Sequence, residues 1–395
     1  MGIAGPTFAY WLTLYGFETT LVEIAPHLRT GGYVIDFWGR GFDVAEKMGI
    51  LPKIKQEGYD IKELRLVNSS GKRVGGLNAE VFRSATNGRY VSIPRGELAK
   101  IIYETVGDRC ETVFGDSITK IEQDESEVRV SFERTEPRRF DMVIGADGLH
   151  SVVRKLVFGK QDLFEKYLGY RVAAFTAKGY RPRDEEVYVS YSLPGRQVAR
   201  FAMRNDQTMF LFVFADAKSR YDEEPAIDHK DILRAEFSDA GWECPQILEA
   251  MESCGEIYFD RVSQIRMSNW SQGRVCLVGD AAFCPSLLAG QGSALAMFGA
   301  YILAGELSRS ADQPRNAFQR YEQQLRRFIV GKQDAAVKFS GSFAPKTRLG
   351  IFLRNKITKA FKFPFVAEMA MGPSLMDRID LPDYTTSVDA GTRTR

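Results

Sequence analysis

Short apolar segments that run directly into glycine-containing turns recur along the chain, and helical patterns accompany them. Three such units are predicted, at residues 6–23, 140–146 and 274–278. In the first unit, the apolar spacing over 6–15 indicates a buried helix that Gly16 ends. The apolar run over 19–23 is typical of a short strand in a parallel sheet. Because the units lie in both halves of the chain, the sequence predicts an α/β layer built from distant segments.

A different pattern occupies the middle of the chain, where large apolar side chains alternate with other residues at the period of a strand. The alternating residues are Phe201 and Met203, and then Phe210, Phe212 and Phe214. They predict an antiparallel sheet inserted into the α/β layer. The expected domains are 1–170 with 265–345 for the α/β domain, 171–264 with part of 65–95 for the sheet domain, and 346–395 for a C-terminal helix and tail.

The charge balance favours a small-molecule partner. The 395 residues include 53 Lys and Arg against 51 Asp and Glu, so the net charge of +2 gives no general attraction to nucleic acid or to an anionic membrane. No apolar run approaches the length of a membrane span, and the start lacks the order of a signal peptide. We therefore expect a cytoplasmic protein without stable membrane association. A monomer is the expected state.

Metal and disulfide chemistry have little support in this sequence. The five cysteines are odd in number and show no CxxC spacing, and the three histidines lie far apart. The sequence therefore predicts no metal site and no disulfide framework. A catalytic triad based on histidine is not expected either.

The first candidate site is the glycine turn at the start of the chain. Gly2 and Gly5 match the second and third glycines of a dinucleotide-binding turn, and Glu23 ends the strand that follows. Glycines let a pyrophosphate approach the backbone N–H groups at a helix N-terminus. The carboxylate of Glu23 can accept hydrogen bonds from ribose hydroxyls. Short turns of this kind also open many helices for packing alone, so the structural alternative has equal weight.

Two further turns carry acidic residues. Asp147 follows the second predicted strand, where it can accept hydrogen bonds from a cofactor or from the backbone. Asp280 follows the third strand and can hold a cofactor hydroxyl, while backbone N–H groups at Gly290 and Gly292 can stabilise negative charge. Each turn alone could be an ordinary strand-to-helix connection. Their order and spacing are more specific than any one of them.

With these three motifs in order, the chain resembles the aromatic-hydroxylase family of flavin monooxygenases over nearly its whole length. Arg95, within the stretch IPRGEL, matches the arginine that reaches FAD in this family. The stretches GDAA, GAYILAGEL and IDLP are similar to those of tetracycline-inactivating monooxygenases. The resemblance implies an FAD-binding Rossmann-like domain of the GR2 type with an inserted antiparallel substrate domain. It implies FAD contacts from Gly2, Gly5, Glu23, Arg95, Asp147, Asp280, Gly290 and Gly292.

The chain departs from the family pattern at three places. The first glycine and the strand before it are absent, so we expect that the first β-strand is missing from this sequence. After the GD motif, the places of a His, a Pro and an Asn are held by Phe283, Leu287 and Ala294, which displaces the stiff proline beside the flavin. Trp38 stands where an arginine is found in related enzymes, and Arg40 therefore receives no firm role.

The resemblance implies that NADPH or NADH reduces FAD and that O2 then supplies an oxygen atom to an aromatic or polyketide-like molecule. No side chain needs to act as a nucleophile, so no catalytic residue is predicted. The substrate would lie between the flavin and the sheet, against Phe201, Met203 or Phe212, although sheet core is the more frequent role of such side chains. Two alternatives stay open: a flavin hydroxylase or Baeyer–Villiger-type oxygenase acting on a polyketide or phenolic compound other than tetracycline, and a non-catalytic or cofactor-poor homologue.

Overall fold

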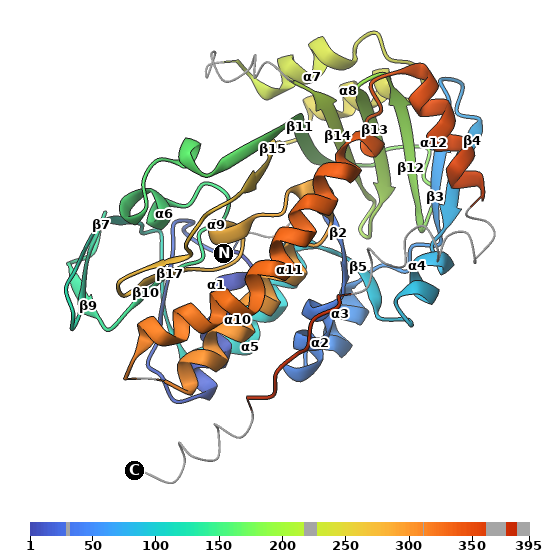
Figure 1. The fold of residues 1–395 in the computed structure, drawn as a ribbon. Helices are drawn as coiled ribbons and strands as arrows, with labels where there is room; N and C mark the ends of the chain where they lie inside the picture. The colour runs from blue at the N-terminus through green and yellow to red at the C-terminus, as the bar shows by residue number, and fades with distance from the viewer. Residues whose placement is uncertain (29–31, 217–226, 311, 361–376, 385–395) are drawn as a thin grey trace.

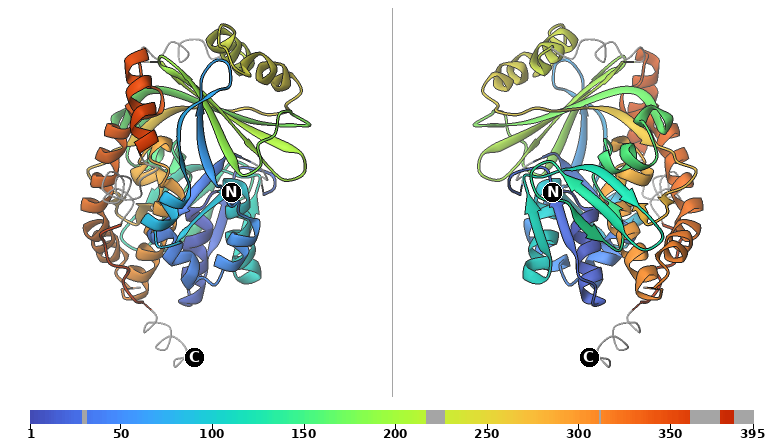
Figure 2. Two further views of the ribbon diagram at one scale, coloured as in Figure 1. Left: turned by 90° about the vertical axis from the view of Figure 1, so that its right-hand side faces the viewer. Right: turned by 90° about the vertical axis from the view of Figure 1, so that its left-hand side faces the viewer.

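A large, mainly antiparallel sheet lies over a helix-rich α/β part (Figures 1 and 2). The computed structural model describes residues 1–28, 32–216, 227–310, 312–360 and 377–384. In Figure 1 the sheet occupies the upper right and the α/β part the lower left, with the N-terminus near the middle of the molecule. Both halves of the chain contribute to each part, so the two parts are joined by several crossings of the backbone.

Two of the sheets of the α/β part are built on parallel strand pairs. β1 pairs with β6, and β10 pairs with β17, whose other edge carries the antiparallel β16. These strands are Thr20–Glu23 (β1), Glu111–Phe114 (β6), Val143–Gly145 (β10), Ser271–Gln272 (β16) and Val275–Leu277 (β17). The strands predicted at 19–23, 140–146 and 274–278 are therefore present, with shorter bounds than their apolar runs.

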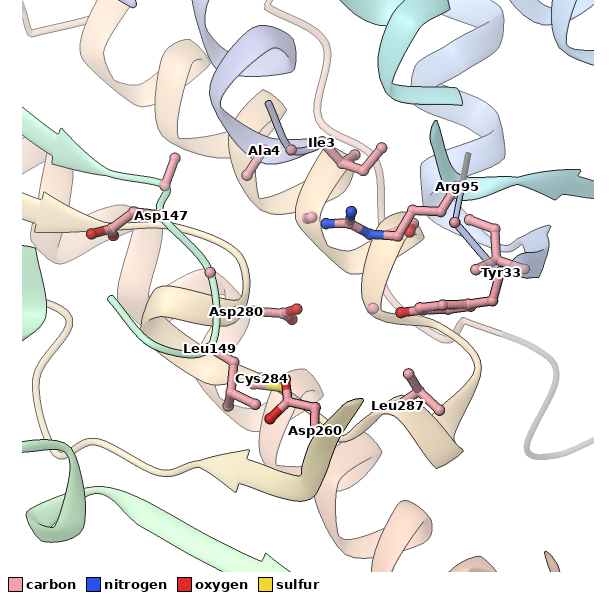
Figure 3. A pocket seen from close by; sticks show the side chains of 18 of the residues that line it. Ile3, Ala4, Tyr33, Arg95, Asp147, Leu149, Asp260, Asp280, Cys284 and Leu287 are labelled. Carbon is pink, nitrogen blue, oxygen red and sulfur yellow. The ribbon is translucent and has the colours of Figure 1, made fainter. Parts of the chain in front are cut away.

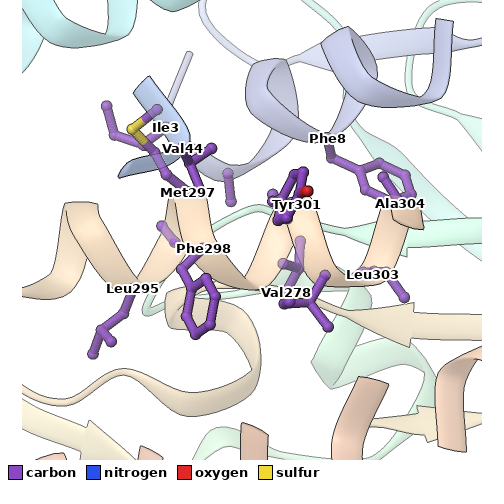
Figure 4. Close-up of a cluster of buried hydrophobic side chains, with 14 of the residues drawn as sticks. Ile3, Phe8, Val44, Val278, Leu295, Met297, Phe298, Tyr301, Leu303 and Ala304 are labelled. Atoms are coloured by element: carbon purple, nitrogen blue, oxygen red, sulfur yellow. The ribbon is translucent and has the colours of Figure 1, made fainter. Parts of the chain in front are cut away.

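Helix α10 forms the centre of this part because it is apolar on all sides. Every residue from Ala294 to Leu307 is buried, as in a helix enclosed by other elements. Figure 4 shows its side chains packed against Phe8 of α1, Val44 of α2 and Val278. The main helices are α1 (Ala4–Leu14), α2 (Arg40–Lys47), α3 (Leu51–Glu57), α5 (Arg95–Val106), α10 (Gly292–Ser308) and α11 (Pro314–Phe343).

Smaller elements complete the α/β part. An antiparallel ribbon of β2 (Val34–Trp38) and β5 (Tyr90–Pro94) lies between the helices and the large sheet (Figure 1). A second small antiparallel sheet is formed by β7 (Ile118–Gln123), β8 (Val128–Phe132) and β9 (Arg138–Phe140). The short helices are α4 (Glu80–Ala85), α6 (Val152–Val157) and α9 (Asp280–Phe283), with 3-10 turns at Gly107–Arg109, Gln161–Leu163 and Leu287–Ala289.

The large sheet has seven strands in the order β15-β11-β14-β13-β12-β3-β4. Its strands are β3 (Glu63–Val67), β4 (Arg73–Asn78), β11 (Glu165–Lys178), β12 (Val187–Leu193), β13 (Arg196–Ala202), β14 (Gln207–Ala215) and β15 (Tyr258–Ile265). Neighbouring strands are antiparallel except for β12 and β3, which are parallel. A hairpin from the first part of the chain, β3 and β4, therefore extends a sheet built mostly from later residues.

The two faces of this sheet have different neighbours, because successive side chains of a strand point to opposite faces. One face packs against α7 (His229–Phe237) and α8 (Cys244–Glu252) in a single apolar core. Phe212 belongs to this core, and its ring centroid lies 4.9 Å from that of Phe237. Met209 and Leu211 alternate with Phe212 and face the α/β part. The alternation predicted from the sequence is present.

Helix α12 (Arg348–Ala360) lies along the edge of the sheet and contacts β4 and β12 (Figure 1). Lys356 and Lys359 on this helix are exposed. Arg354 differs, because it is partly buried and donates a hydrogen bond to Ser192 Oγ at 3.1 Å.

Residues 377–384 return to the α/β part and are fixed there by polar contacts. The backbone N–H of Arg40 donates to Asp377 Oδ2 at 2.8 Å, and the Arg40 side chain donates to the carbonyl oxygen of Ile379 at 2.6 Å. Tyr384 donates to the carboxylate of Glu306 at 2.8 Å. Arg40 therefore anchors a late segment of the chain.

The mixed α/β class predicted from the sequence is confirmed by this architecture. The Rossmann-like detail, the domain boundaries and the absent first strand stay predictions. Within the described residues, β1 and β10 each pair along one edge only. The tail expected at 385–395 lies outside the described residues.

Candidate functional site

A continuous cavity lies between the α/β part and the large sheet. Its volume is about 2060 Å³, which exceeds the roughly 300–1,000 Å³ of a typical site for one small ligand. One end is lined by the N-terminal turn, by β1 and by the loops that follow β10 and β17. The other end is lined by side chains of β3, β4, β12 and β14. The cavity therefore has room for a dinucleotide and a second molecule.

The N-terminal turn forms the first wall of the cavity. Gly2 and Gly5 both line it, and α1 begins between them at Ala4. A β-carbon on Gly5 would lie 3.6 Å from atoms of Ala146 and Leu21, so the turn is packed between the two parallel strand pairs. No side chain caps the N-terminus of α1. Its first backbone N–H groups are therefore available to an anion.

Arg95 brings positive charge to the same place. It is the first residue of α5, and its backbone N–H donates to the carbonyl oxygen of Tyr33 at 3.0 Å. Figure 3 shows the side chain extended across the cavity, and a β-carbon on Gly2 would lie 3.8 Å from its Nη2. Within the described part of the chain, the guanidinium has no hydrogen bond or ion pair. A free guanidinium beside an uncapped helix N-terminus suits a phosphate group.

Glu23 ends β1 at the cavity wall, as the sequence predicts. Its Oε1 accepts a hydrogen bond from the backbone N–H of Ala25 at 2.9 Å. Its Oε2 lies 3.0 Å from the amino group of Met1. The carboxylate is therefore held next to the glycine turn, where a ribose hydroxyl would share or replace the contact with Met1.

Asp280 opens α9, and its carboxylate points into the middle of the cavity (Figure 3). Burial raises the pKa of Asp280, while the positive charge of Arg95 and a hydrogen bond from Cys284 lower it. Gly279, directly before it, packs so closely that a β-carbon there would lie 3.1 Å from the β-carbon of Ala4. The fold therefore brings the GD motif into contact with the N-terminal turn.

The loop before α10 forms the wall beside Asp280. Gly290 has a φ of +68°, which residues with side chains rarely adopt, and a β-carbon there would lie 3.2 Å from the ring of Trp38. Gly292 is the first residue of α10, and no side chain caps this helix. The backbone N–H groups at its start are therefore free to stabilise negative charge in the cavity.

Asp147 has a different setting from the other predicted residues. Its carboxylate accepts hydrogen bonds from Ser151 Oγ and, at 3.0 Å, from the backbone N–H of Val153. It thereby organises the start of α6, and Figure 3 shows it directed away from Asp280. A direct contact between Asp147 and a cofactor stays a prediction, and the geometry favours the ordinary capping role that the sequence also allowed.

Several cavity residues were not predicted from the sequence. The rings of Tyr33 and Tyr258 lie 5.4 Å apart near Arg95. His150 Nε2 lies 3.0 Å from Asp260 Oδ1, and this hydrogen bond raises the pKa of His150. Only His150 had a sequence signal, because it directly follows the turn that begins at Asp147. The others lie on β15 or directly before β2, and the fold brings these two segments to the same wall of the cavity.

The predicted substrate residues do not line the cavity. Phe212 lies on the opposite face of the sheet, in the core with α7 and α8, so the proposal that it contacts substrate is wrong. Phe201 and Met203 lie on the cavity side but are buried in a separate cluster with Tyr188. The side chains of the sheet that do line the cavity include Met209, Leu211, Tyr188, Ser190 and Gln197.

Comparison with known proteins agrees with this geometry. Residues 1–331 match the sequence profile of a family described as an FAD binding domain. A flavin-dependent monooxygenase from an unknown prokaryotic organism is 35% identical over 390 residues, which covers 97% of this chain and 97% of the relative. The chain belongs to the family of FAD-dependent monooxygenases. The tetracycline destructases Tet(55) and Tet(51) are similar in structure, with TM-scores of 0.82 and 0.79, identities of 31% and 32%, and 97% of both chains covered in each comparison.

Membership of the FAD-dependent monooxygenase family confirms the resemblance drawn from the three motifs, and with it the cofactor FAD. In the described ranges, no helix combines the length and apolarity that crossing a bilayer requires. The same residues contain no cluster of three or more side chains that could hold a metal ion.

Proposed function

We propose that this FAD-dependent monooxygenase uses NADPH or NADH and O2 to oxygenate an aromatic or polyketide-like small molecule. A tetracycline-type compound is the first candidate substrate. The apolar end of the cavity and the likeness to Tet(51) and Tet(55) support this substrate class. The size of the cavity supports simultaneous binding of FAD and substrate.

The unpaired guanidinium of Arg95 is the observation that carries the proposal. A cation inside a cavity is costly unless it gains a partner. Beside it lie the uncapped N-terminus of α1 and the glycine turn, which leave space for a pyrophosphate. In this arrangement Asp280 would bind a hydroxyl of the FAD ribityl chain and Glu23 a hydroxyl of the ribose. Charge-assisted hydrogen bonds of this kind are among the stronger polar contacts in proteins.

FAD supplies the redox chemistry when it is bound. The protein orients its ring and excludes water. Backbone N–H groups at the start of α10 would stabilise negative charge on the ring, because the helix dipole favours an anion there. No side chain of the cavity needs to form a bond with the substrate, so we assign no nucleophile.

The cavity face of the sheet would bind the substrate. Met209, Leu211 and neighbouring residues provide an apolar floor that suits a flat ring. Ser190 provides a polar group at this floor, and its buried Oγ has no hydrogen-bond partner among the described residues. A hydroxyl without a partner is costly to bury, and a polar group on the substrate would satisfy it.

The proposal is tested on purified protein reconstituted with FAD. We expect a flavin absorption spectrum, oxidation of NADPH or NADH that added substrate accelerates, and a product heavier by one oxygen atom in mass spectrometry. Tetracycline and a panel of phenolic compounds are compared as substrates. A protein that cannot retain added FAD would support the alternative of a cofactor-poor homologue. Oxygenation of a phenol but not of tetracycline would support the alternative of an oxygenase that acts on a compound other than tetracycline.

A further inference from the structure

A polar cluster of Asp36, Tyr90 and Ser92 lies in the wall of the cavity on the ribbon of β2 and β5. Asp36 and Ser92 are directly opposite each other in the two strands. Tyr90 Oη and Ser92 Oγ each donate a hydrogen bond to Asp36 Oδ1 at 2.6 Å. The two hydroxyls therefore occupy one carboxylate oxygen and fix the orientation of the other.

The second oxygen of Asp36 is the part of this cluster that faces the cavity. Asp36 and Tyr90 both line the cavity. Within the described ranges, Oδ2 of Asp36 has no hydrogen-bond partner and the carboxylate has no ion pair with a cation. Burial raises the pKa of Asp36, while hydrogen bonds from Ser92 and Tyr90 lower it. The side chain of Asp36 is exposed on the cavity side of the ribbon, so Oδ2 is open to a further hydrogen-bond donor in the cavity.

The surroundings of Asp36 place it at the substrate end of the cavity. β2 is held against the large sheet, because the backbone N–H of Val34 donates to Met209 Sδ at 3.0 Å. Met209 belongs to the apolar floor of the cavity. The ring of Tyr90 stacks on Phe82, with centroids 5.8 Å apart. Asp36 is thus bordered by aromatic rings and by the sheet, and it lies on β2, three residues beyond Tyr33.

We infer that Asp36 recognises the substrate by accepting a hydrogen bond at Oδ2 from a phenolic or enolic hydroxyl. This inference rests on the proposed function and narrows its substrate class to hydroxylated aromatic or enolic compounds. The neutral hydroxyls of Tyr90 and Ser92 already donate hydrogen bonds to Oδ1. One further neutral donor at Oδ2 would give both carboxylate oxygens a hydrogen bond, and no cation is needed. Tyr90 and Ser92 act as positioning residues, because they hold Oδ1 and leave Oδ2 toward the cavity.

The test measures binding, so it does not depend on turnover. Two matched aromatic probes, 2-naphthol and 2-methoxynaphthalene, are titrated into the FAD-reconstituted protein by calorimetry, with 2-naphthylmethylamine as a cationic probe. We expect 2-naphthol to bind about tenfold more tightly than its methyl ether, as a hydrogen bond to a charged acceptor allows. FAD content is recorded for each sample. Loss of FAD would therefore be seen as a failure of the proposed function and not of the role of Asp36.

Variants assign the preference for the hydroxyl to Asp36. In Asp36→Asn the amide oxygen takes the place of Oδ1 and its NH2 group faces the cavity, so the preference should disappear. Tyr90→Phe removes one positioning hydroxyl while keeping the ring, and a smaller loss of preference is expected. Glu249→Gln, on the exposed surface of α8, is the matched control and should keep the preference. A wild-type protein that binds both naphthalenes equally, or binds neither, overturns the inference. So does an Asp36→Asn variant that keeps the preference, or tighter binding of the amine.

Discussion

At the scale of single residues, the free charge of Arg95 makes a direct prediction about FAD retention. Arg95→Ala should weaken FAD binding roughly ten- to a hundredfold, because a charge-assisted hydrogen bond contributes about 1.5–3 kcal/mol. The FAD affinity of Arg95→Lys should lie between those of the wild type and Arg95→Ala, since lysine keeps the positive charge but lacks the planar guanidinium group. Fluorescence titration of FAD measures the affinity. Arg129→Ala, on the exposed side of β8, is the control. Equal affinities of the two alanine variants would remove Arg95 from the site.

Two neighbouring residues on β14 should respond differently to the same truncation. Phe212→Ala should destabilise the protein by about 3–5 kcal/mol, because it empties part of the core beneath α7. Leu211→Ala, on the cavity face, should cost less stability and should weaken binding of 2-naphthol. Urea unfolding and calorimetric titration separate the two effects. A larger loss of probe affinity in Phe212→Ala than in Leu211→Ala would contradict the assignment of the two faces.

Cavity residues that belong to the three sequence motifs could be predicted from the sequence. Cavity residues that only the tertiary structure brings together could not. Gly5 and Asp280 stand in turns that the sequence marks, and the fold brings these turns into contact. Phe212 was misassigned because alternation separates two faces of a strand without showing which one meets the cavity. Asp36 was not recognised because a single acid in a short apolar strand gives no signal before its partner Ser92 on β5 is known.

At the scale of elements, Asp116 holds together the turns that connect β6 to β7 and β8 to β9. Burial opposes ionisation of Asp116, but hydrogen bonds from Thr135 and from the backbone N–H groups of Ser117, Arg134 and Thr135 outweigh it and lower the pKa from 3.8 to about 2. A lowered pKa in the folded state means that the carboxylate stabilises the fold above pH 3.8 and loses this effect as the pH falls through about 2.

Asp116→Asn should therefore be less stable than the wild type at neutral pH. The difference should shrink as the pH falls from about 4 toward 2, since the wild-type carboxylate then becomes protonated. The midpoint of urea unfolding, measured for both proteins across this range, checks the expectation. A difference that stays constant with pH would show that the shape of the side chain matters and its charge does not.

The elements that carry motifs were predicted with approximate bounds, while the ribbon of β2 and β5 was not. The predicted helix at 6–15 begins earlier, at Ala4, because the turn itself joins the first helical turn. The strands shorten to the residues that pair, as in β10. The ribbon depends on pairing between segments that are far apart in the sequence, and hydrophobic periodicity does not report such pairing.

At the scale of the whole molecule, a cavity shared by both parts predicts that FAD stabilises them together. FAD at a hundred times its dissociation constant should raise the free energy of unfolding by about 2.7 kcal/mol. Trp242 reports on the sheet part, where its ring lies 6.0 Å from that of Tyr191, and Trp270 lies in the α/β part beside Phe283. Urea unfolding is followed by the fluorescence of the wild type and of Trp242→Phe, with and without FAD. FAD should move the unfolding midpoint to higher urea by the same amount in both proteins. A shift absent from the Trp242 signal would show that the parts unfold separately.

The parallel pairing of β3 with β12 has a consequence for synthesis on the ribosome. The hairpin of β3 and β4 leaves the exit tunnel long before β12. The edge of β3 that later pairs with β12 therefore has no partner strand while the intervening chain is made. Unpaired edges with apolar side chains such as Leu64 and Leu66 promote association between nascent chains. Transient shielding by a chaperone would therefore matter most while the ribosome translates the segment between the two strands. A premature stop within that segment would release a fragment prone to aggregate.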